Sequence, residues 1–129
     1  MKVAVLIARI LLGLVFVVFG FNKLVPFLHA PMPGGDAGAM AGLMFTHGWL
    51  KLYGVIEVAS GLALLAGRFV PLALTLLAGV GLNILLFHIT LEPSGLLIPL
   101  VLAALELFLV YAYRTSFVGV FAARAKPAV

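Results

Sequence analysis

Three ionisable side chains stand within long apolar runs of this sequence. Glu57 lies in GVIEVASGLALL, with no other charged residue within five positions on either side. Arg9 lies in an apolar run near the N-terminus, and Glu106 lies in another near the C-terminus. A charged group in such surroundings costs free energy unless it is paired or hydrogen-bonded. Each of the three therefore needs a partner.

Helical depth predicts which of these groups meet. At a rise of about 1.5 Å per residue, Arg9 and Glu106 fall at similar depth, and Glu57 falls slightly deeper. A guanidinium can hold two carboxylates, so we expect Arg9 to pair with Glu57, with Glu106 as second partner; which carboxylate Arg9 prefers stays open. One carboxylate is in excess, and beside a cation it is a candidate proton acceptor. Alternatively, the ion pairs only fix the helix register.

Spacing within the helices predicts which faces come together. Gly13 and Gly20 share one helical face with Arg9 and Lys23, and small residues on a face allow another membrane helix to approach closely. The face that carries Glu57 has the same device, with Gly54 and Gly61.

A looser polar group lies toward the other helix ends: Lys23, Asn83 and His88. Together these side chains suit an anionic or quinone-like headgroup, whereas singly Asn83 suits a helix–helix hydrogen bond and His88 an interfacial position. The histidines show no ligand spacing, so we expect neither haem nor a metal site. Absence of cysteine excludes disulfide and thiol redox chemistry within this chain.

Composition defines the elements that must position these residues. The 129 residues are 65% hydrophobic and 9% charged, against about 25% charged in soluble domains. We therefore expect an all-α integral membrane protein in the lipid bilayer. Four stretches approach the roughly 20 residues needed to cross it. They predict a single domain, 1–129, that is a four-helix transmembrane bundle with helices at about 3–21, 49–66, 70–88 and 96–113.

The long loop 22–48 contains a short apolar stretch, AGAMAGLMFTH, that predicts an interfacial helix over one mouth of the bundle. Most cations lie on the other side, with the termini and the tail 114–129, and the positive-inside rule makes that side cytoplasmic. The net charge of +4 thus indicates membrane orientation, and no nucleic-acid partner is expected. The cations on that side are Lys2, Arg68, Arg114, Arg124 and Lys126.

Four segments together resemble the DoxX-like family of small bacterial membrane proteins. They are RILLGLVFVVFGFNKL, GVIEVASGLALL, GRFVPLAL with NILLFHITLEPSG, and LELFLVYAYR, and the likeness spans roughly residues 5–115. The resemblance implies a four-helix bundle in the bacterial plasma (inner) membrane, related to subunits of quinone-coupled sulfur oxidation and to partners of soluble redox proteins. It also implies a functional set of Arg9, Lys23, Glu57, Asn83, His88 and Glu106.

Three functions follow as hypotheses. The first is a redox-associated subunit that binds a quinone or similar lipid-soluble ligand within the bundle, as part of a membrane oxidoreductase whose partner protein or bound cofactor supplies the electrons. The second is a small proton-coupled transporter or permeability module, which four helices could form only as a homo-oligomer. The third is a non-catalytic partner subunit. The chain contains no catalytic motif that decides among them.

Overall fold

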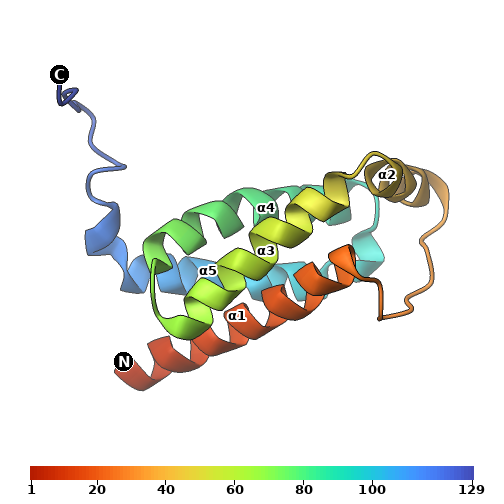
Figure 1. Ribbon diagram of the computed structural model, residues 1–129, viewed down its shortest axis with the longest axis horizontal. Helices are drawn as coiled ribbons and strands as arrows, with labels where there is room; N and C mark the ends of the chain where they lie inside the picture. The colour runs from red at the N-terminus through yellow and green to blue at the C-terminus, as the bar shows by residue number, and fades with distance from the viewer.

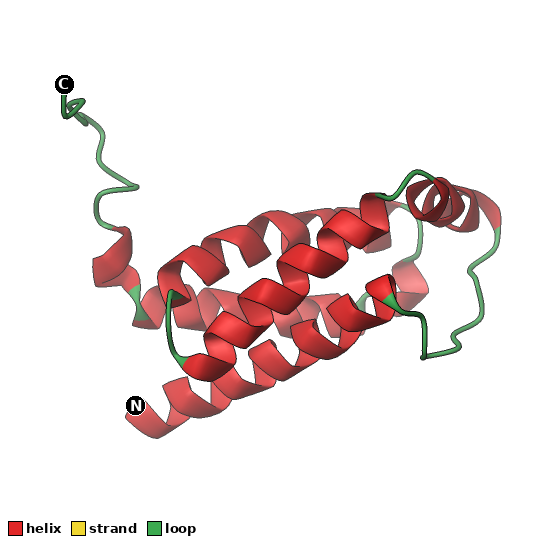
Figure 2. Cartoon of the chain, viewed as in Figure 1, coloured by secondary structure: helices red, strands yellow, loops and turns green.

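The computed structural model describes residues 1–129 and contains only helices and loops (Figures 1 and 2). The elements are α1 (Lys2–Leu24), α2 (Gly35–Thr46), α3 (Trp49–Ala66), α4 (Val70–Thr90), η1 (Pro93–Gly95), α5 (Leu97–Ala112) and η2 (Arg114–Phe117). The all-α class is therefore confirmed. The helices α1, α3 and α4 have the length and composition of membrane spans, whereas α5 is apolar but has 16 residues. The count of four spans stays a prediction.

The four long helices form a bundle in which α1 packs on α3, α3 on α4, α4 on α5 and α5 on α1. Both chain ends lie at one end of this bundle, which we call the terminal end (Figure 1). The short helix α2 lies at the opposite end, the α2 end, where it contacts α3. The structure thus has a helix within the long first loop, where the sequence predicts one.

The closest helix contact is between α1 and α3, at four glycines that we call the glycine seam: Gly13, Gly20, Gly54 and Gly61. A Cβ added at Gly54 would lie 2.7 Å from the carbonyl oxygen of Gly20, and one added at Gly61 would lie 2.8 Å from that of Gly13. Side chains other than hydrogen would push the two backbones apart. The close approach expected from these glycines is confirmed.

The apolar core occupies the half of the bundle nearer the terminal end. Its fully buried leucines come from all four helices, and they are Leu12, Leu64, Leu74, Leu77 and Leu109. Toward the α2 end the interior contains Gly20, Gly54 and the carboxyl group of Glu57, with two cavities beside them. Close packing stabilises this apolar core, whereas the cavities beside Glu57 have room for a ligand.

The helix α1 continues past the predicted end at residue 21 and includes Lys23 in its last turn. The chain then turns sharply, because the Asn22 Oδ1 accepts hydrogen bonds from the backbone N–H groups of Phe27 and Leu28, at 2.9 and 2.8 Å. Lys23 therefore belongs to a rigid helix and not to the loop, which fixes where its side chain can reach.

Candidate functional site

A buried ion pair joins α1 to α3. The Lys23 Nζ lies 2.8 Å from Oε2 and 3.0 Å from Oε1 of Glu57. The Glu57 side chain is 1% exposed and that of Lys23 is 23% exposed. Hydrogen bonds between charged groups are among the strongest in proteins, so the pair offsets the free-energy cost of burying Glu57 in an apolar helix.

The glycine seam positions this pair. Gly20 lies one turn before Lys23, and a Cβ added at Gly20 would lie 2.8 Å from the Cβ of Glu57. Helical side chains lean toward the N-terminus of their own helix. The Lys23 side chain can therefore run back along α1, over Gly20, and reach the carboxylate of Glu57.

The predicted pairing of Arg9 with Glu57 is wrong. The Arg9 Nη1 donates instead to the hydroxyl of Tyr113, at 3.4 Å. A Cβ added at Gly67 would lie 2.9 Å from the same nitrogen, so Arg9 is level with the C-terminal cap of α3. Gly67 is ten residues beyond Glu57, about 15 Å along a helix. The depth estimate failed because α1 begins well beyond the end of α3.

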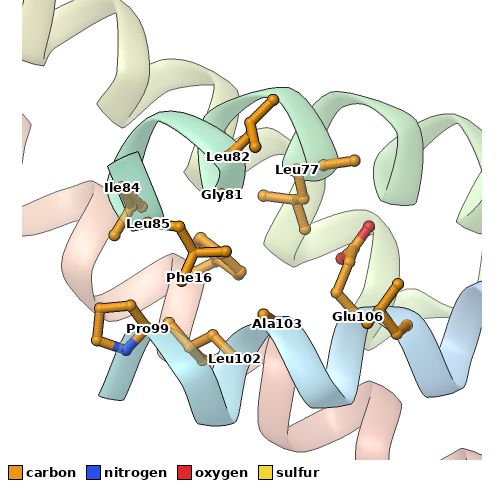
Figure 3. Close-up of a pocket in the computed structure, with 12 residues that line it drawn as sticks. Phe16, Leu77, Gly81, Leu82, Ile84, Leu85, Pro99, Leu102, Ala103 and Glu106 are labelled. Atoms are coloured by element: carbon orange, nitrogen blue, oxygen red, sulfur yellow. The ribbon is translucent and has the colours of Figure 1, made fainter. Parts of the chain in front are cut away.

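The second predicted partner, Glu106, also lies apart from both cations. Its two carboxyl oxygens are buried and have no hydrogen-bond partner. Figure 3 shows its side chain directed from α5 toward α4, among apolar side chains. The predicted cluster of Arg9, Glu57 and Glu106 therefore does not form, and its members occupy three separate environments.

A cavity of about 230 Å³ opens beside the ion pair, beneath α2. Lys23 and Glu57 line it together with Asn83 and His88, so the structure brings four of the six predicted site residues into one cavity. The remaining lining comes from α2 and from the ends of α3 and α4 nearest to it, and consists of Met40, Ala41, Met44, Trp49, Leu50, Tyr53, Ile84 and Phe87.

A second cavity, of about 310 Å³, lies on the other side of the same group. It shares Lys23, Glu57, Ile84 and His88 with the first cavity. Its other walls come from α1, η1 and α5 and are apolar. The ion pair and His88 thus form a polar partition between two apolar spaces, a position from which they can contact a ligand in either.

The hydrogen bonds that His88 and Asn83 make within α4 determine which of their donors and acceptors stay free for a ligand. The His88 Nδ1 lies 2.8 Å from the carbonyl oxygen of Ile84. Because a carbonyl only accepts, Nδ1 carries a proton, and the neutral ring has its free lone pair on Nε2. The Asn83 Nδ2 donates to the carbonyl of Gly79 at 3.1 Å, which leaves one N–H and the amide oxygen free.

The other histidines lie away from this group, His29 in the loop after α1 and His47 at the end of α2. No three potential metal-ligating side chains cluster in the structure. One buried polar residue, Ser60 on α3, was not singled out from the sequence; its hydroxyl has no partner. Serine is common in membrane helices, and no signal in the sequence separates Ser60 from a packing residue.

Comparison with known proteins places this bundle in a family. The DoxX family profile matches residues 4–90. The protein is a member of the DoxX family. The matched region runs from the first turn of α1 to the end of α4 and includes Lys23, Glu57, Asn83 and His88, whereas Glu106 lies beyond it. No curated protein and no solved structure gave a significant match to the chain.

Proposed function

We propose that this DoxX protein binds a quinone, or a similar lipid-soluble ligand with a hydrogen-bonding headgroup, at the partition between the two cavities. The observation that carries the proposal is the ion pair of Lys23 and Glu57, buried at the wall of both cavities beside Asn83 and His88. Ligand sites are mostly apolar with a few polar groups that converge, and this arrangement matches that description.

The donor set suits a headgroup with two oxygens. The Lys23 ammonium has three N–H donors and makes two contacts with Glu57. Asn83 retains one free N–H. These groups can donate to carbonyl oxygens. The Nε2 lone pair of neutral His88 can accept from a hydroxyl, as in a quinol. A quinone bound here would supply two-electron, two-proton chemistry, and the chain's own part would be to hold the headgroup and exchange protons with it.

The apolar surroundings suit a ring and its tail. The Met40 and Met44 side chains of α2 line the first cavity, and methionine adapts readily to aromatic surfaces. Ile98 and Leu102 line the second cavity on the side of α5, where an alkyl tail would leave toward lipid. In this proposal the electrons come from a partner protein or a bound cofactor, because the chain has no thiol that could supply them. We also propose that α5 is the fourth membrane span and that both termini lie in the cytoplasm of a bacterium.

The single tryptophan provides a direct test. Trp49 lines the first cavity, so a quinone bound there should quench its fluorescence. We expect saturable quenching when a short-chain quinone is titrated into the purified protein in lipid nanodiscs. Substitution Glu57→Gln should weaken binding at least tenfold, while Arg9→Gln at the terminal end should not change it. Quenching that does not saturate, or that is the same in Glu57→Gln, would contradict the proposal.

The absence of cysteine makes the topology testable as well. A cysteine placed at Gly42 on α2 should react with an impermeant maleimide added outside whole cells. A cysteine placed at Val129 should react only after the membrane is opened. The reverse pattern would show that the protein has the opposite orientation.

A further inference from the structure

A separate cavity of about 190 Å³ lies between α4 and α5 (Figure 3). Twelve residues line it, and Glu106 is the only one with a polar side chain. The cavity shares apolar wall residues with its neighbour toward the α2 end, but it contains none of Lys23, Glu57, Asn83 and His88. It is therefore a different chemical environment from the site proposed above.

Glu106 has no partner within the chain. Both of its carboxyl oxygens are buried without a hydrogen bond, and no cation lines the cavity. The two half-buried cations of the bundle pair with other groups: Lys23 with Glu57, and Arg9 through Nη1 with the hydroxyl of Tyr113, while the Arg9 Nε has no partner. A carboxylate in hydrocarbon is costly, and its charge is compensated either by a proton or by a cation that comes from outside the chain.

We propose that this cavity binds a lipophilic organic cation, an ammonium group carried on a small apolar body. Charge complementarity selects the class of ligand, because ionised Glu106 supplies only acceptor oxygens and no other lining side chain supplies a donor for an anion or a carbonyl headgroup. Phe16 adds an aromatic ring to the same wall, and aromatic faces attract cations.

Size and access define the ligand further. An apolar cavity of about 150 Å³ accommodates benzene, so this one has room for an aromatic ring with a short cationic substituent. Leu82 and Leu107 line the cavity and are each 69% exposed. In a membrane those two side chains face lipid, and a lipophilic cation would enter from the bilayer between α4 and α5. This inference does not depend on quinone binding.

The test uses benzyltrimethylammonium and its neutral isostere neopentylbenzene, titrated calorimetrically into the purified protein in zwitterionic nanodiscs. We expect saturable binding of the cation by the wild-type protein and binding at least tenfold weaker in Glu106→Gln. The neutral isostere should bind the two proteins with equal affinity. Absence of saturable cation binding to the wild-type protein would overturn the proposal, and so would equal cation affinity in Glu106→Gln.

Two further variants locate the site. Ala103 lines the cavity and points into it (Figure 3), so Ala103→Leu should fill the space and abolish binding of both probes while keeping the carboxyl group. The matched control is Asp36→Asn, which removes a negative charge from the exposed first turn of α2 and should leave cation affinity unchanged. Cation binding that survives in Ala103→Leu would overturn the proposed location even if Glu106→Gln did not fold.

Discussion

A buried carboxyl group has opposite surroundings in two regions of the molecule, the glycine seam between α1 and α3 and the cavity between α4 and α5. At the seam, Glu57 meets a lysine from the neighbouring helix at hydrogen-bond distance. In the cavity, Glu106 meets only apolar side chains. Both residues are glutamates in apolar helices, so the difference comes from the neighbouring helix and not from the residue itself.

Helix separation explains the contrast. Glycines bring α1 so close to α3 that a lysine one turn away can reach across the contact. A Cβ added at Gly81, which lines the cavity on α4, would meet nothing within 4 Å, so this glycine leaves open space where those of the seam create contact. Small residues therefore support an ion pair in one region and a cavity in the other.

The largest expected effect comes from removing the cation at the seam. Substitution Lys23→Met leaves Glu57 buried without its partner, which should destabilise the protein by about 3 kcal/mol. Unfolding in mixed micelles of increasing dodecyl sulfate measures the change. The matched control is Lys51→Met, on the exposed side of α3, with an expected change within about 0.5 kcal/mol. Equal stability of Lys23→Met and wild type would show that the pair contributes nothing.

The next effect contrasts two glycines. Substitution Gly20→Ala places a methyl group 2.8 Å from the Cβ of Glu57, which should cost about 2 kcal/mol through overpacking. Substitution Gly81→Ala adds the same methyl group in open space and should stabilise α4 by about 0.5 kcal/mol through helix propensity. The same unfolding assay compares them. If both substitutions changed the free energy of unfolding in the same direction, the packing of the seam would not differ from that of the cavity in the way described.

The third contrast, between the two buried glutamates, includes a gain of stability. Substitution Glu106→Leu removes a buried carboxyl group that has no partner, so we expect the protein to become more stable by about 1 kcal/mol. The same change at the seam, Glu57→Leu, should instead destabilise it, because Lys23 then loses its partner. Thermal unfolding of both variants, followed by circular dichroism, checks the signs. Loss of stability in Glu106→Leu would mean that the carboxyl group has a partner after all.

The sequence predicts the helical class and the residues at the proposed site better than it predicts their pairing. Run length and composition are local properties, and they locate Glu57, Asn83 and His88 on helices without any knowledge of packing. Pairing depends on the axial offset between helices, which run length does not report. The pairing of Arg9 with Glu57 assumed that the first residue of α1 and the last residue of α3 lie at the same depth, and they do not.

One signal in the sequence does contain the offset. Gly13 and Gly20 are seven residues apart, and so are Gly54 and Gly61. Aligning these two pairs in antiparallel helices places Gly20 against Gly54 and Gly13 against Gly61, as in the structure. Arg9 then falls level with the last turn of α3, and its side chain leans away from Glu57, whereas the side chain of Lys23 leans back toward Glu57. The cavity beside Glu106 has no comparable signal, because it results from side-chain volumes on three helices.

A double-mutant cycle between Lys23 and Glu57 tests the central claim most directly. The free energy of unfolding is measured for wild type, Lys23→Met, Glu57→Gln and the double variant, and a second cycle replaces Lys23→Met with Arg9→Met. Contacting pairs show coupling energies of about 0.5–3 kcal/mol. We expect about 2 kcal/mol for Lys23 with Glu57 and nearly zero for Arg9 with Glu57. Strong coupling of Arg9 to Glu57, with none for Lys23, would contradict the account.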